Sequence, residues 1–180
     1  MAASVLLSIT ASVLPHAVLA NPFPGDNGDF TVADSSLHTY CWDASMNLQE
    51  ERDVAEYAMV VLVDTTDMTV DLVNCSGDTD VWWYSLNLPA GIRGLRGCVD
   101  YVNANVCNSA DVAFDLAEFD VGPNDWQDRR KTSVHELGHS IGLGHNENVV
   151  NAMISGEIDS DSIDDRRYTN HDVNHINIAY

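Results

Sequence analysis

Three histidines between residues 135 and 145 have the types and spacing of a metal-binding site. His135 and His139 are four residues apart, so on a helix they project from one face and can reach a single zinc ion. Gly142 lets the chain turn sharply after that helix, which brings His145 back as a third ligand. Three protein ligands leave a fourth position open, as in catalytic rather than structural zinc sites.

Glu136 follows the first of these histidines and points to the side of the pair, where it can contact a water on the metal without ligating it. Its carboxylate is then placed to act as a general base. The H-E-x-x-H pattern also arises by chance, and a histidine pair can be a plain surface feature. The added Gly142 and His145, at the expected end of a helix, favour the metal site.

The helix that must carry these residues is predicted over about 125–141. Gly122-Pro123-Asn124 breaks the chain before it, and Asn124 with Gln127 has the spacing of a capping box. Gly142 is placed to end the helix, because glycine accepts the left-handed conformation past a helix terminus.

Apolar periodicity predicts the elements around this helix. A second amphipathic helix is expected at 48–63, a short C-terminal helix near 171–178, and a loop with spaced glycines at 91–97. Strands are predicted at residues 37–42, 68–73, 81–88 and 111–119.

The segment from His135 to His145 resembles the zinc motif of the metzincin metallopeptidases, H-E-x-x-H-x-x-G-x-x-H. Downstream, residues 151–156 read Asn-Ala-Met-Ile-Ser-Gly and are similar to the methionine turn of that clan. The resemblance implies that Met153 lies beneath the three histidines, whereas a simple core methionine is the alternative. Ser155 stands where astacin-like and serralysin-like enzymes have a tyrosine ligand.

The resemblance also implies the fold. It is an α+β, metzincin-like zincin fold with a mixed, mostly parallel twisted sheet, an active-site helix and a short C-terminal lobe. The chain is compact, like a matrixin or reprolysin-like catalytic domain. In that layout an edge strand near residues 91–99 would pair with an extended substrate.

The first twenty residues predict a secretory signal peptide, cleaved after Ala20. They contain no Asp, Glu, Lys or Arg, and an apolar stretch runs from residue 5 to 14. A buried N-terminal helix or a membrane anchor is the alternative, but Pro15 and His16 interrupt the stretch. The expected organisation is a signal peptide at 1–20, a flexible lead at 21–36 and a catalytic domain at 37–180.

The four cysteines agree with export, because an even number in an exported chain indicates disulfides. They form no C-x-x-C pair and lie apart from the histidines, so zinc ligation by cysteine is not expected. Three pairings are possible. Cys41–Cys75 with Cys98–Cys107 is favoured, since the second would close a short loop and the first would tie the N-terminal segment to the next strand.

The net charge of −20, from 28 acidic and 8 basic residues, argues against nucleic acid and anionic membranes as partners. The negative charge has three alternative explanations, which are high solubility, adaptation to high salt and calcium binding. An acidic run lacks the glycine and terminal glutamate of an EF-hand, so a solvated face is favoured over a Ca²⁺ site there. Its members are Glu157, Asp159, Asp161, Asp164 and Asp165.

Two weaker candidates lie near the C-terminus. His171 and His175 form another i, i+4 pair, for which a structural or surface role is favoured over a second metal site. Tyr168 is a candidate oxyanion contact.

These observations together predict a secreted, extracellular and monomeric zinc endopeptidase, with Glu136 as general base and protein or peptide substrates. The expected cofactor is one catalytic Zn²⁺, with Ca²⁺ as a possible second ion. One alternative is a secreted binding module that holds zinc without catalysis, although binding alone would not need Glu136. Another is a zinc hydrolase of non-protein amides, such as cell-wall peptides.

Overall fold

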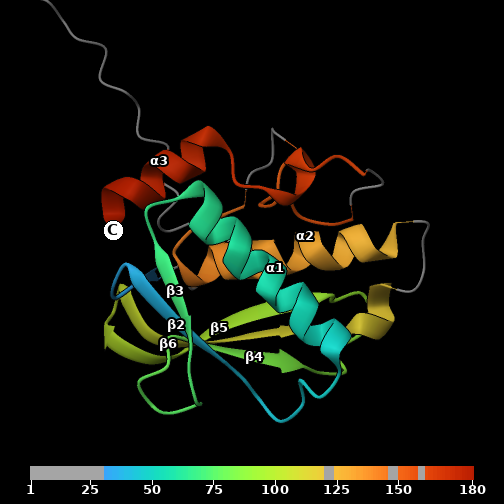
Figure 1. Cartoon of the computed structure of the whole chain (residues 1–180), viewed down its shortest axis with the longest axis horizontal. Helices are drawn as coiled ribbons and strands as arrows, with labels where there is room; N and C mark the ends of the chain where they lie inside the picture. Colours follow the sequence, from blue (N-terminus) through green and yellow to red (C-terminus); the bar gives the residue numbers. More distant parts are fainter. Residues whose placement is uncertain (1–30, 120–123, 146–149, 158–160) are drawn as a thin grey trace, which may run out of the picture.

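A mostly parallel β-sheet with helices packed on one face forms the body of the protein (Figure 1). The computed structural model describes residues 31–119, 124–145, 150–157 and 161–180. The predicted signal peptide and residues 21–30 of the predicted lead lie outside these ranges. Among the described residues, no helix is both long and apolar enough to cross a lipid bilayer.

Five strands are hydrogen-bonded in one continuous order, and a sixth strand pairs with one of these five outside that order. In spatial order the five are β1 (Val32–Ala33), β6 (Val106–Phe114), β4 (Val81–Ser85), β2 (Leu37–Trp42) and β3 (Thr69–Leu72). These five pair in parallel, whereas β5 (Gly94–Asn103) runs antiparallel to β6. The expected mixed, mostly parallel sheet is therefore confirmed.

The helices lie over one face of this sheet (Figure 1). They are α1 (Gln49–Thr65), α2 (Asp125–Ser140) and α3 (Asn170–Ala179), with two short 3₁₀ segments, η1 (Leu116–Phe119) and η2 (Asp164–Arg166).

The core lies between the sheet and the first two helices. Val54, Ala58 and Leu62 are four residues apart, so they form one buried face of α1. Each large side chain removed from water in this way contributes about 1.5–3 kcal/mol. The sheet and α2 supply Trp83, Phe114, Val134 and Leu137, all of them buried. The apolar side chains of α2 thus pack the histidine-bearing helix onto the sheet.

The predicted helices and the first three predicted strands match the structure to within about three residues at each end. The capping box at the start of α2 is not formed. Asn124 is the N-cap, but its side chain makes no cap hydrogen bond. Its backbone carbonyl instead accepts from the amides of Gln127 and Asp128, at 2.8 and 3.0 Å.

The predicted strand at 111–119 ends earlier than its alternating pattern suggests. The strand β6 stops at Phe114, because the buried Asp115 accepts hydrogen bonds from the amides of Leu88 and Ala117, at 2.8 and 3.0 Å. These bonds turn the chain into η1. The predicted loop at 91–97 was also partly wrong, since its second half belongs to β5.

Part of the predicted N-terminal lead belongs to the folded domain. Val32 and Ala33 form β1 and pair with Val106 and Cys107 of β6. The amide of Ala33 also donates to the hydroxyl of Tyr180, at 2.6 Å. A strand of two residues leaves no periodic pattern, so only its distant partners reveal it.

Both disulfides join the cysteines that the sequence analysis favoured. Cys41 of β2 is bonded to Cys75, and Cys98 of β5 is bonded to Cys107 of β6. The second bond links the two antiparallel strands. Disulfides form and persist in oxidising compartments, so both bonds are consistent with an extracellular protein.

A buried histidine under α2 makes the stability of the fold dependent on pH. The ring of His38 in β2 bonds through Nε2 to the Ser140 hydroxyl at 3.0 Å, and burial lowers its pKa to about 4. The unfolded chain binds this proton more readily, near pH 6.5. The stabilisation is therefore complete above about pH 6.5 and is lost as the pH falls towards 4.

We expect His38→Gln, which cannot titrate, to lose less stability than the wild type between pH 6.5 and 4. When the free energy of unfolding is plotted against pH, the slopes of the two proteins should differ by up to about 1.4 kcal/mol per pH unit. Denaturant unfolding at a series of pH values measures it. The exposed His171, replaced by glutamine, is the control, and identical slopes in wild type and His38→Gln would contradict the prediction.

Candidate metal centre

The last turns of α2 and the residues after it bring the three predicted histidines together. His139 Nε2 lies 3.1 Å from His135 Nε2 and 3.2 Å from His145 Nε2. One ligand atom from each of the three lies within 4.8 Å of the others. Nitrogens around a tetrahedral ion with bonds of about 2.1 Å are about 3.4 Å apart. The spacing is therefore close to that of a metal-ligand set.

The outer nitrogens of two of these rings fix which nitrogen faces the centre. His135 Nδ1 donates to the Ala152 carbonyl at 2.8 Å, and His139 Nδ1 donates to the Leu143 carbonyl at 2.7 Å. A carbonyl only accepts, so both protons are on Nδ1 in the neutral rings and both Nε2 atoms carry lone pairs. Two such lone pairs 3.1 Å apart repel each other unless a cation lies between them.

Burial keeps these two rings neutral. It lowers the pKa of His139 to about 4 and that of His135 well below its usual value. Neutral imidazole is the form that binds a metal ion. The donor set therefore fits a metal, and the backbone carbonyls behind it hold the rings as outer-shell partners do in metal sites.

Gly142 makes the turn that the sequence predicts after α2. Its φ of 95° is in the left-handed region, which side chains with a Cβ rarely adopt. The amide of Leu143 then donates to the Gly138 carbonyl at 2.9 Å, which closes the end of the helix. This turn places the Leu143 carbonyl behind His139 and directs the chain back towards His145.

Met153 is fully buried and packs against Gly138 of α2, which lies between His135 and His139. A Cβ on Gly138 would overlap the Met153 sulfur, so only glycine allows the methionine to pack this closely. The preceding carbonyl, from Ala152, is the one that holds His135. The segment predicted as a methionine turn therefore both packs against the helix and orients His135.

Tyr168 does not take the role suggested for it. The ring is buried beside Gly138, and its hydroxyl donates to the Val134 carbonyl at 2.9 Å. Burial raises the pKa of this phenol. Tyr168 therefore supports α2 from below and does not line the cleft beside the histidines.

A cleft of about 270 Å³ opens beside the histidines. Its walls come from the turn that precedes β5, from the first residue of β5, from α2 and from the segment after Met153. The lining residues are Gly91, Ile92, Arg93, Gly94, Lys131, Thr132, His135, Glu136, His145, Ser155 and Gly156. The site is thus open to a molecule from solvent on one side of the histidines.

Glu136 lines this cleft next to the ligand group. The side chain is 8% exposed, and burial raises its pKa to about 8, against the opposing charges of Lys131 and Arg96. A Cβ on Gly94 would lie 2.6 Å from Glu136 Oε1 and 2.6 Å from Thr132 Cγ2. The absence of a side chain at Gly94 therefore lets β5 pass directly over the carboxylate.

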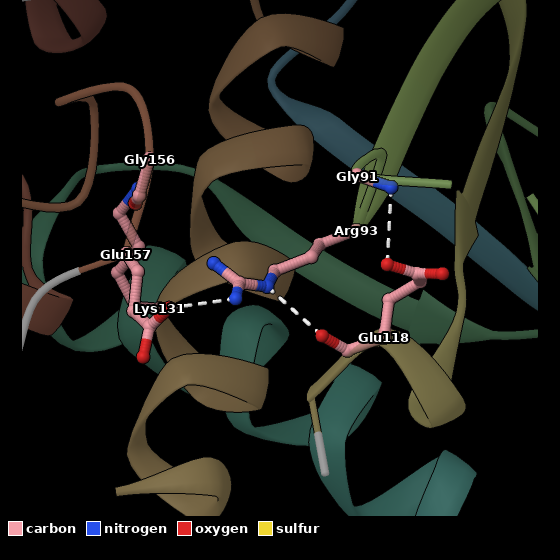
Figure 2. Close-up of polar contacts among 6 residues, drawn as sticks. All are labelled: Gly91, Arg93, Glu118, Lys131, Gly156 and Glu157. Atoms are coloured by element: carbon pink, nitrogen blue, oxygen red, sulfur yellow. Dashed lines mark hydrogen bonds and ion pairs between the residues drawn. The ribbon is translucent and has the colours of Figure 1, made fainter. Parts of the chain in front are cut away.

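Two cations in the cleft were missed by the sequence reasoning. Lys131, the only lysine of the chain, donates to the carbonyls of Ile154 and Gly156, the second at 2.9 Å. Arg93 donates to a Glu157 carboxylate oxygen at 2.6 Å (Figure 2). The signal that could have found them is their rarity, because basic residues are few in this acidic chain.

The remaining candidates do not belong to the group of three histidines. The rings of His171 and His175 are 4.5 Å apart on α3. Within the described residues, however, the only group of three or more side chains that could hold a metal ion is His135, His139 and His145. In the acidic run, Glu157 pairs with Arg93 and Asp165 is buried. Asp159 lies outside the described residues.

The comparisons with known proteins give no assignment. No protein-family model matches the chain, and no curated protein matches its sequence.

Proposed function

We propose that this protein is a secreted zinc-dependent endopeptidase of the metzincin type. His135, His139 and His145 are its zinc ligands, and Glu136 is its general base. One observation carries the proposal: three imidazole nitrogens converge beside a buried carboxylate at the wall of an open cleft. A metal-binding module without catalysis would not need that carboxylate.

Zinc is the metal that this donor set favours. Three neutral imidazoles with one open position are typical of catalytic zinc sites, whereas calcium and magnesium prefer oxygen ligands. Bound there, zinc would act as a Lewis acid that polarises a carbonyl and makes a water more acidic.

The residues of the chain supply the rest of the chemistry. Glu136 takes a proton from the attacking water and passes it to the leaving amine, as a general base and then a general acid. Burial raises the pKa of this carboxyl group, which favours the protonated form that the second step needs, whereas a metal ion on the histidines would favour the carboxylate that the first step needs. Gly94 of β5 lies directly against this carboxylate and leaves no room for a side chain there.

The substrate backbone has a natural place along β5. Within the described residues this strand pairs only with β6, so its other edge offers unpaired backbone groups. Because Gly94 lines the cleft at the start of β5, an extended peptide added to this edge would lead towards the histidines. Met153 against Gly138 and the mostly parallel sheet also support the metzincin assignment.

Hydrolysis of casein tests the proposal. The protein is expressed for export, purified, and assayed with and without a zinc chelator, at low and high salt. Cleavage that the chelator stops and added zinc restores would support an endopeptidase. A folded chain that binds one zinc ion and leaves casein intact would contradict it. Purified peptidoglycan, assayed in parallel for newly released amino groups, tests the hydrolysis of cell-wall amides.

We expect Gly94→Ala to reduce turnover by about 100-fold and leave metal binding intact. The new methyl group would push the Glu136 carboxylate or β5 from its place, and errors of about 1 Å in a reacting group cost this much. Gly97→Ala in the same strand is the matched control, since nothing lies within 4 Å of its Cβ. Equal kcat for the two variants would contradict the close approach of β5 to the base.

A further inference from the structure

The cleft differs in charge from the rest of the molecule. The chain has 28 acidic and 8 basic residues, yet the ionisable side chains that line the cleft, apart from the two histidines, are Arg93, Lys131 and Glu136. A divalent metal ion on the histidines would add further positive charge. Clefts of one sign within a surface of the other attract ligands of the opposite charge. The lining of the cleft thus has two cations and one carboxylate, in a protein whose net charge is strongly negative.

Lys131 is a buried cation whose desolvation outweighs the attraction of the Glu136 and Asp128 carboxylates. Its side chain is on α2, one turn before His135, and the residue is only 4% exposed. Its two hydrogen bonds go to backbone carbonyls, and no carboxylate of the described residues forms an ion pair with it. An ammonium group has three protons to donate, and burial makes an unpaired one costly. A negative group that enters the cleft would offset this cost.

Arg93 already binds a carboxylate from the chain itself. Its guanidinium donates to Glu157 at 2.6 Å and to the Glu118 carbonyl at 3.1 Å (Figure 2). The Glu118 side chain accepts from the Gly91 amide at 3.0 Å, so the turn that carries Arg93 is held in place. The Glu157 side chain is 36% exposed, and exposed ion pairs contribute little stability. A ligand carboxylate can therefore replace it at small cost.

We propose that the cleft selects a carboxylate of the substrate, held by Arg93 and Lys131 in place of Glu157. This inference rests on the proposed peptidase function. The carboxylate comes from an Asp or Glu side chain beside the scissile bond, or from the free C-terminus of a short peptide. In both cases the two cations determine specificity and take no part in bond cleavage.

The test measures binding, so that it does not depend on turnover. Zinc-loaded Glu136→Gln protein is titrated by calorimetry with tetra-alanine peptides that carry one Glu, or one Gln, at each position in turn. All are made with a free and with an amidated C-terminus. We expect Glu to bind about tenfold more tightly than Gln at one position, with less discrimination at high salt. Preference for the free C-terminus alone would identify the chain end as the carboxylate.

Two variants with opposite expected effects separate specificity from structural support. Arg93→Gln, in the same Glu136→Gln background, should reduce the tenfold preference to less than threefold. Glu157→Gln should increase the affinity for the acidic peptide about threefold or more, because it removes the internal competitor. Glu56→Gln, an exposed change on α1, is the matched control for charge.

The outcomes distinguish this inference from the proposed function. Equal binding of every Glu and Gln pair, and of both C-terminal forms, would overturn it even if casein is cleaved. A preference that Arg93→Gln leaves unchanged and Glu157→Gln does not increase would also overturn it. Selective carboxylate binding by a protein that leaves casein intact would retain the inference and reject the peptidase.

Discussion

Glu136→Gln is expected to lower kcat by about 10²–10⁴-fold while one metal ion stays bound, as is usual when a general base is lost. Glutamine has the same shape, so it still fits beneath Gly94 and beside Thr132. Its amide cannot accept a proton from water. The metal would be held by the three histidines and not by residue 136, so the metal content should not change.

Parallel measurements of peptide hydrolysis and of zinc per chain check this prediction. Glu56→Gln on α1 is the matched control, because it makes the same chemical change on an exposed surface. If Glu136→Gln keeps more than about a tenth of the wild-type kcat, another group must act as the base.

His145→Ala is expected to weaken zinc binding by at least about 100-fold. Loss of an outer-shell partner typically costs 10–100-fold in affinity, and a direct ligand should cost more. His145 is the exposed member of the three, so its removal leaves no buried cavity. Replacing His135 or His139 would instead leave the Ala152 or Leu143 carbonyl without its donor.

Competition with a chromophoric chelator measures the affinity, and thermal unfolding gives a second readout. Zinc at 100 times its Kd should stabilise the wild type by about 2.7 kcal/mol. The same zinc concentration should barely stabilise His145→Ala. His171→Ala is the matched control, since this histidine is also exposed but lies on α3. Equal zinc affinity in His145→Ala and wild type would exclude His145 as a ligand.

The parts that sequence predicts well are those that depend on neighbours along the chain. The i, i+4 spacing of His135 and His139 and the glycine at 142 belong to one helix and its end, so local rules place them. The same holds for the buried face of α1, which its four-residue spacing reveals. Both disulfides were also favoured in advance, from the spacing of the cysteines and their place beside predicted strands.

The contacts that sequence does not predict join distant segments. Gly94 over Glu136 depends on how β5 packs against α2, and the Arg93–Glu157 pair crosses the cleft. The pairing of β1 with β6 is equally long-range. At Asp115 a buried carboxylate accepts a hydrogen bond from Leu88, which overrides an alternating pattern that continues to Phe119. Periodicity contains no information about such partners.

The placement of the ligands along the chain also affects the order in which the site assembles. All three histidines lie within residues 135–145, whereas Gly94, which confines Glu136, comes from a strand much earlier in the sequence. Contacts between near neighbours form before distant ones, because they close smaller loops. During folding, the chain should therefore capture metal first and position its base later. On the proposed function, a newly made molecule would bind metal before its base is confined, and cleavage of its own chain would be delayed until β5 has docked.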